Sequence, residues 1–251
     1  MSDTSLGPAV TVEGASCRLR PSPTALAVRL DGLRARDGAA LTALLERLPE
    51  PPWDVDVPSA DPLVGLVREA GFDVYATGAL WARPVEGIPV PDPPGRVEIS
   101  DYRNDMAAHF VAAERRAMEG LAAFTELGSP SGYEWGEGQG VFVVAYRNGE
   151  LVGFAHADMP DGTLDWMGVV PDARRQGIGT ALLRGLAQRV REQRGTHLMA
   201  FAQEGTDGPA FLASQGFAAK GGRTLAIRRA DGASGGGHGE PAPQGPVRSI
   251  R

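Results

Sequence analysis

The chain has 251 residues, enough for one large domain or two modest ones, and its 25 basic and 31 acidic residues give a net charge of −6. This balance argues against general binding to nucleic acid or anionic membranes, because both select a basic surface. The single cysteine, Cys17, excludes an intramolecular disulfide. Without a secretory leader or about 18 consecutive apolar residues, we expect a cytoplasmic protein with no membrane span.

The first part of the chain, residues 15–88, alternates between strand and helix patterns. We expect strands at 24–30, 53–57 and 75–83, and helices at 38–48 and 61–70. Residues 1–14 are expected to be loose. Residues 89–95 are rich in proline and predict a stiff linker to the second part, residues 95–229.

The second part begins with an Ala-rich helical pattern at 106–127, followed by three β-rich runs. These runs are 141–146, 151–155 and 163–170. Asn148-Gly149 separates the first two and Asp161-Gly162 precedes the third, and both pairs favour tight turns. The pattern predicts an antiparallel meander of three strands.

The rest of the second part returns to alternating helix and strand. We expect an amphipathic helix at 179–194, a strand at 197–202, a short helix at 209–215 and a last strand at 224–228. The order β-β-β-α-β-α-β predicts a mixed sheet of the α/β (α+β) class. Residues 230–251 are rich in Gly and Pro and predict a disordered tail.

The first part repeats a fragment of the second. Ala70-Gly71-Phe72 occupies the position that Gln215-Gly216-Phe217 has later in the chain. Residues 24–83 therefore look like a half-length, degenerate copy of residues 163–228. The alternative is that two αβ units share this pattern by chance.

A glycine-bearing turn opens the helix that follows the meander. Its residues are Arg174, Arg175, Gln176, Gly177, Ile178, Gly179 and Thr180. The first amides of a helix lack internal partners and, with the helix dipole, attract anions. Gly177 and Gly179 let a phosphate approach the backbone, and Arg174 and Arg175 add positive charge. The turn predicts a pyrophosphate site, and it lacks the Gly-Lys-Ser/Thr of triphosphate loops and the third glycine of the dinucleotide fingerprint.

With this turn, the sequence resembles the GNAT superfamily of acyl-CoA N-acyltransferases. Arg174-x-x-Gly177-x-Gly179 matches the pyrophosphate motif of that family, and residues 211–217, which end in Gly216-Phe217, match its second motif. The resemblance covers residues 95–229. Residues 15–88 resemble a degenerate half of the same fold without the phosphate motif.

The resemblance implies acetyl-CoA as co-substrate and direct transfer of the acetyl group from the thioester to an amine. Backbone groups of Val169, Val170 and Pro171 would bind the pantetheine arm, where the sheet is expected to open after Val170. The amide near Val169 would polarise the thioester carbonyl. The amides of residues 175–180 would hold the pyrophosphate.

The catalytic residues are less well marked. Many family members carry a tyrosine, as general acid, where this chain has Leu212, so Tyr133 or water would protonate the thiolate. Asp165 is a candidate general base; the alternative places it on the solvent face of its strand. Tyr133, Glu134 and Trp135 lie in a loop that would select the amine or serve only as a connection.

Two further side chains are expected to be structural. His156 alternates with Phe154 in its strand. If the strand of Asp165 is regular, Trp166 faces away from Asp165 and belongs to the core. No His/Cys/Asp cluster has metal-ligand spacing, so no metal is expected.

The sequence thus predicts an acetyl-CoA-dependent N-acetyltransferase that acts on a small-molecule or peptide amine. One alternative is a non-catalytic acyl-CoA-binding or assembly module, which is favoured by Leu212 at the position of the usual acid. Another is transfer of a longer acyl group. We expect the first part either to finish a sheet edge of the second or to form a homodimer.

Overall fold

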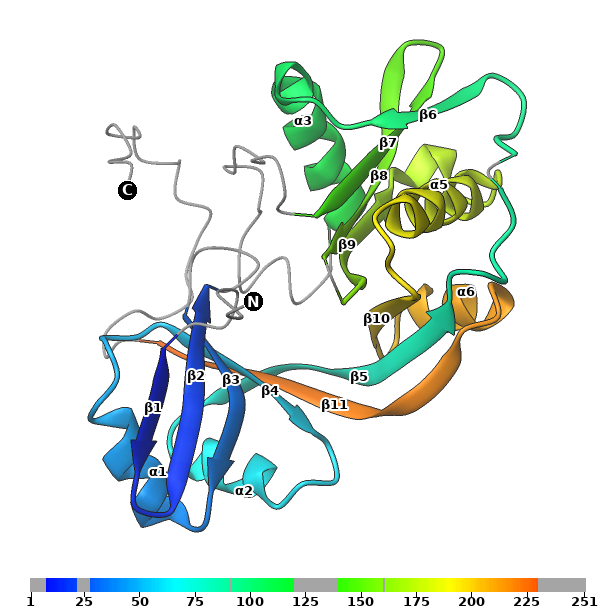
Figure 1. Cartoon of the computed structure of the whole chain (residues 1–251). Coiled ribbons are helices and arrows are strands. Elements are labelled where there is room, and N and C mark those ends of the chain that lie inside the picture. The colour runs from blue at the N-terminus through cyan, green and yellow to red at the C-terminus, as the bar shows by residue number, and fades with distance from the viewer. Residues whose placement is uncertain (1–7, 22–27, 91, 120–139, 160, 230–251) are drawn as a thin grey trace.

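The computed structural model describes residues 8–21, 28–90, 92–119, 140–159 and 161–229. One mixed sheet runs through these residues in the strand order β1-β2-β3-β4-β11-β5-β10-β9-β8-β7-β6 (Figure 1). The strands are β1 Ala9–Val12, β2 Ala15–Pro21, β3 Val28–Ala35, β4 Trp53–Pro58, β5 Asp73–Pro84, β6 Val97–Asp101, β7 Val141–Arg147, β8 Glu150–Asp158, β9 Thr163–Val169, β10 His197–Gln203 and β11 Ala218–Arg228. The helices are α1 Gly38–Leu45, α2 Leu63–Glu69, α3 Ala107–Met118, α5 Ile178–Glu192 and α6 Gly208–Ser214, with short 3-10 turns η1 Asn104–Met106 and η3 Pro171–Ala173. The expected α/β class with a mixed sheet is confirmed.

The meander of the second half has four strands instead of the expected three, because β6 pairs with β7 ahead of it. Only Val97 and Ile99 are apolar in this five-residue strand, which hid it among polar neighbours. The turn between β7 and β8 is confirmed, with positive φ at Asn148 (53°) and Gly149 (83°).

Helices α3 and α5 cover opposite faces of this meander. Successive residues of β8 alternate between them, since Gly153 lies against Leu182 of α5 and Phe154 packs edge-on to Phe110 of α3. The apolar stripe expected on α5 is buried in the same core. The two helices therefore hold β8, which pairs with the strand of the candidate base Asp165, from both sides. None of the described helices is both long and apolar enough to cross a membrane.

The first half is more complete than expected, because β1 and β2 form a hairpin ahead of β3. The expectation that residues 1–14 are loose was wrong for β1, whose turn to β2 uses Gly14 at φ +79°. The strand expected at 24–30 begins at Val28 and continues to Ala35, and residues 22–27 lie outside the described part of the chain.

The two halves share one order of elements. β1-β2-β3-α1-β4-α2-β5 is followed later by β7-β8-β9-α5-β10-α6-β11, and in both the strands around the first helix, β3 with β4 and β9 with β10, pair in parallel. The repeat is longer than the residues 24–83 matched in the sequence.

The last strands of the two halves are exchanged. β5 pairs with β10 of the second half, β11 pairs with β4 of the first, and β5 and β11 pair with each other. Figure 1 shows both strands running from one half to the other. β5 of the first half thus covers the β10 edge of the second half, which is one of the two expected arrangements, and β11 of the second half covers the β4 edge of the first. β11 is also longer than the expected 224–228, because Gly221-Gly222 masks its first residues.

We expect Gly78→Ala in β5 to destabilise both halves together. A Cβ atom on Gly78 would lie 2.7 Å from the Phe201 ring of β10 and closer still to the backbone oxygen of Ala202. The strands would have to separate, so the free energy of unfolding should fall by about 3 kcal/mol, the upper part of the overpacking range. Urea denaturation measures this change. The control Gly65→Ala, in α2 with open space at its Cβ position, should leave stability unchanged or raise it by up to about 1 kcal/mol. An unchanged midpoint for Gly78→Ala would contradict the exchange of strands.

Candidate active site

β9 and β10 separate after two pairs of residues, and this opens the sheet between them. β9 and β10 pair only at Thr163–Met199 and Leu164–Ala200. Beyond these pairs β9 continues against β8 as far as Val169, whereas β10 continues against β5. Among the described residues, one edge of β9 from residue 165 onward is therefore not paired with a strand, and an extended ligand can lie along it as an added strand would. The opening was expected after Val170 and starts earlier.

The turn at the end of β9 presents a row of amides. Arg175 (φ 61°) and Gly177 (φ 80°) both have left-handed backbone conformations, and α5 begins directly after them. The first helical bond runs from the Ala181 amide to the Gly177 carbonyl at 3.0 Å, and no side chain caps the helix. Within the described residues, the amides of residues 175–180 donate no hydrogen bond. Such a row of converging donors at a helix N-terminus is suited to a phosphate group.

The side chain of Arg174 forms hydrogen bonds with two backbone carbonyls of the protein. Its Nε donates to the Val169 carbonyl and its Nη2 to the Ala117 carbonyl, each at 3.0 Å. It thereby ties the end of β9 to the end of α3. Arg174 and Arg175 are both exposed beside the amides, and the bonds of Arg174 are those to Val169 and Ala117.

Gln176 braces the turn from its other side. Its side-chain amide donates to the Asp172 carbonyl at 3.0 Å, and its Oε1 accepts from Arg147 of β7 at 2.6 Å. Asp172 in turn pairs with Arg116 of α3 at 2.7 Å. The turn is therefore held in place before any ligand arrives, which lowers the entropy cost of binding.

Asp165 stands at a β-bulge in β9. His156 of β8 pairs with Trp166, and the next residue, Ala157, pairs with Leu164, so Asp165 is an extra residue on its strand. Its carboxylate forms a 2.7 Å hydrogen bond with Nδ1 of His156. Trp166 donates from Nε1 to Glu114 of α3 at 2.9 Å. Both side chains therefore turn toward the α3 face, and the expectation that they face apart was wrong because the strand is not regular.

The side chains of this pair differ in their access to solvent. His156 is 1% exposed, as expected for a structural histidine, whereas Asp165 is 15% exposed. The Asp165 carboxylate is thus largely buried and does not lie on an open solvent face. It is the member of the pair that a substrate can reach.

His156, Asp158 and Asp165 have ligand-type atoms within 4.8 Å of one another. The sequence predicted no such group, because spacing along the chain does not reveal residues that meet across two neighbouring strands. An imidazole with two carboxylates is a set that divalent cations accept. Because the imidazole and the Asp165 carboxylate already share a hydrogen bond, the arrangement also suits the handling of a proton.

The position of the family's usual general acid, Leu212, lies on α6. Leu212 is 4% exposed and belongs to the main core. Ser214 is exposed and its hydroxyl donates to the Phe211 carbonyl at 2.6 Å, as expected for a residue that caps its helix. Tyr133, Glu134 and Trp135 lie outside the described residues.

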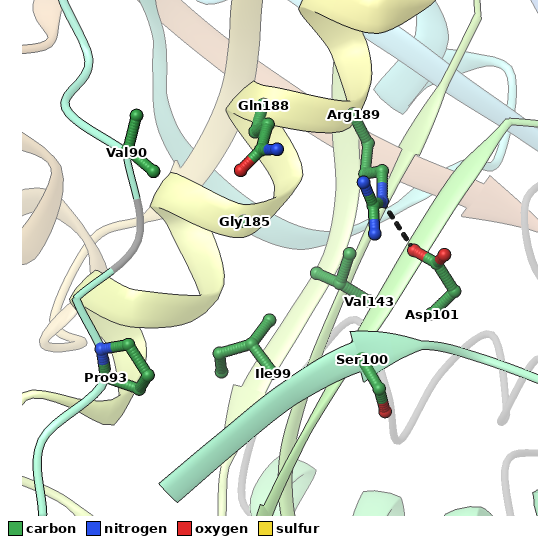
Figure 2. A pocket seen from close by; sticks show the side chains of 9 residues that line it. All are labelled: Val90, Pro93, Ile99, Ser100, Asp101, Val143, Gly185, Gln188 and Arg189. Carbon is green, nitrogen blue, oxygen red and sulfur yellow. Dashed lines mark hydrogen bonds and ion pairs between the residues drawn. The ribbon is translucent and has the colours of Figure 1, made fainter.

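A cavity among the described residues lies away from this opening. It has a volume of about 320 Å³ and lies between the linker, β6 and α5, with the Asp101–Arg189 ion pair at 2.7 Å along its wall (Figure 2). Neither the amide row nor Asp165 lines it. We therefore place the candidate site at the opening of β9.

The matching position in the first half is closed by its own side chain. Asp37 is the N-cap of α1, and its Oδ1 accepts the Ala40 amide at 2.8 Å. This amide, and then Arg36, hold the pKa of Asp37 below its usual value. A carboxylate thus occupies the helix end where a phosphate would bind, and the link between β3 and α1 has no counterpart of the Gly177 turn.

Comparison with known proteins agrees with this geometry. Residues 97–219 match the family model described as Acetyltransferase (GNAT) family. No curated protein matches the sequence. The solved GCN5-related N-acetyltransferase from Kribbella flavida is similar at 19% identity and a TM-score of 0.61, over 88% of this chain and 89% of that chain.

Two other solved structures have the same fold. The GCN5-related N-acetyltransferase from Sphaerobacter thermophilus is 16% identical with a TM-score of 0.57, over 86% of this chain and 76% of that chain. A tandem GNAT protein from the clavulanic acid biosynthesis pathway is 14% identical with a TM-score of 0.57, over 88% of this chain and 80% of that chain. At these identities the likeness is one of fold.

Proposed function

Residues 97–219 belong to the GNAT acetyltransferase family, and from this premise we propose that the chain moves the acetyl group of acetyl-CoA directly onto an amine. The observation that carries the proposal is the row of amides at residues 175–180, which donate no hydrogen bond to a described residue, beside the opening between β9 and β10. A pyrophosphate fits the row of amides, and an extended pantetheine arm fits the opening of the sheet.

The proposed coenzyme site follows from these two features. The amides of Arg175, Gln176, Gly177, Ile178, Gly179 and Thr180 hold the pyrophosphate. The pantetheine arm then runs back along β9, past Pro171, Val170 and Val169, so that its thioester end points toward Asp165. An amide near Val169 polarises the thioester carbonyl. Arg174 contributes by fixing the end of β9.

In the proposed reaction the acceptor arrives as an ammonium ion and gives one proton to Asp165. The free amine nitrogen attacks the thioester carbon, the C–S bond breaks, and coenzyme A leaves as a thiolate. The second amine proton is lost as the amide forms. With Leu212 at the position of the usual acid, we assign protonation of the thiolate to water or to Tyr133, and selection of the amine to the loop that holds Glu134.

The second candidate function is a non-catalytic acyl-CoA-binding or assembly module. The buried Leu212 favours it, because an apolar residue there supplies no proton to a leaving thiolate. It shares the coenzyme site of the first proposal and differs in predicting no acetylated product with any amine.

We propose further that the first half is a degenerate copy of the same fold. The shared order of elements supports this, as does the likeness to a protein described as a tandem GNAT. Because Asp37 caps α1, this copy should bind no pyrophosphate.

Isothermal titration with acetyl-CoA tests this assignment. We expect one molecule bound per chain, at the second half alone, because only that half has the row of amides. A stoichiometry of two would contradict the role given to Asp37. No binding to the folded protein would contradict the proposed function itself.

A further inference from the structure

We propose that His156 is a positioning residue, whose Nδ1–H holds the Asp165 carboxylate in the orientation from which it accepts the proton of the acceptor. This inference rests on the proposed function. It follows from the bulge at Asp165, the confinement of the His156 ring and the different exposure of the two side chains.

The bulge leaves Asp165 with little else to orient it. As the extra residue of β9 it has no partner across β8, and a short side chain at such a position can take several rotamers. Its carboxylate accepts no hydrogen bond from the described residues except that from His156, at 2.7 Å. That bond therefore selects the orientation, and since a carboxylate accepts, it places the proton of the imidazole on Nδ1.

The His156 ring is itself confined. It is 1% exposed, and the Phe142 ring packs against it edge-on with centroids 5.6 Å apart. Gly140 lies so close that a Cβ atom there would be 2.6 Å from Nε2 of His156. A ring enclosed in this way holds its hydrogen-bond direction with little further loss of entropy, which is how a supporting residue makes a site precise.

The difference in exposure separates the two roles. Asp165, at 15% exposed, can contact a substrate, whereas His156 cannot and acts through Asp165. Phe110 and Phe154 are fully buried on the same face, which also holds the buried Glu114 with its hydrogen bond from Trp166. An apolar side chain would pack there without needing a hydrogen-bond partner, so packing alone does not account for an imidazole at this position.

Two neutral replacements test the hydrogen bond by its geometry. In His156→Asn the side-chain NH2 is attached to Cγ, as Nδ1 is in histidine, and can still donate to Asp165. In His156→Gln the NH2 lies one bond further out and cannot. We expect kcat to fall about 100-fold in His156→Gln, the effect of a misplaced reacting group, and less than 10-fold in His156→Asn. KM for acetyl-CoA should stay within twofold in both variants.

The double variant His156→Gln/Asp165→Asn gives a second test. If His156 acts only through Asp165, His156→Gln should lower kcat no further in the Asp165→Asn background. Equal losses of kcat in the Asn and Gln variants, full additivity with Asp165→Asn, or a loss confined to KM would overturn the proposal.

Loss of wild-type activity in EDTA with recovery on adding zinc would also overturn it, because His156, Asp158 and Asp165 would then act as a metal centre. A wild-type protein that binds acetyl-CoA and acetylates no amine would overturn the proposed reaction, and this inference with it.

Discussion

Acetyl-CoA binding is expected to weaken by about 100-fold or more when Gly177 is replaced by glutamate. Gly177 has φ +80° and its amide belongs to the row at the start of α5. A glutamate there brings bulk and a negative charge to the place proposed for the pyrophosphate. Losing two hydrogen bonds to a charged group, at roughly 1.5–3 kcal/mol each, accounts for an effect of this size. Isothermal titration of the purified variant measures it.

Gly71→Glu is the matched control for this variant. Gly71 also has a left-handed backbone (φ +82°), and a Cβ atom there would meet only the Arg228 side chain at 3.9 Å. It lies in the first half, so the variant has the same change of charge and a similar backbone strain away from the site. We expect it to bind acetyl-CoA as the wild type does. Equal loss of binding in both variants, or full affinity in a folded Gly177→Glu, would count against the assigned turn.

Asp165→Asn is expected to lower kcat by about 10²–10⁴-fold, the usual contribution of general acid–base catalysis. The amide has nearly the same shape and can still accept the hydrogen bond of His156, but it does not take up a proton. KM for acetyl-CoA should stay within about twofold, because the proposed coenzyme site lies further along β9. Initial rates of thiol release over a range of acetyl-CoA concentrations separate the two constants.

Asp101→Asn serves as the control for this second prediction. It removes the same charge from an exposed ion pair with Arg189, beside the cavity between β6 and α5 (Figure 2). Such a pair contributes about 0–1 kcal/mol to stability, so the activity should be unchanged. A fully active Asp165→Asn would exclude Asp165 as the base and favour Glu134, in the loop before β7, as the base instead.

Local signals in the sequence were sufficient for the glycine turn before α5, where we propose that the pyrophosphate binds, and for the hairpin at Asn148-Gly149. In both, glycine permits a left-handed backbone that few other residues adopt, so the sequence marks the position directly. Helix α5 was predictable for a similar reason, since its buried face recurs at helical spacing.

Features that depend on pairing between distant strands could not be predicted in this way. The exchange of β5 and β11 is decided by which strand each meets, and nothing within residues 73–84 specifies β10 as the partner. The bulge at Asp165 likewise arises from the register between β8 and β9. The sequence pattern favoured a structural His156, and its hydrogen bond to Asp165 depends on that register, which the sequence does not reveal.

Amine-dependent release of coenzyme A thiol from acetyl-CoA, with mass spectrometry of the acceptor, tests the central claim most directly. The wild-type protein should release thiol and acetylated product in equal amounts with at least one member of a panel of polyamines, aminoglycosides, amino acids and peptide N-termini. The Gly177→Glu variant should release neither. Binding of acetyl-CoA without product from any amine would contradict acyl transfer and leave the acyl-CoA-binding module as the function of this chain.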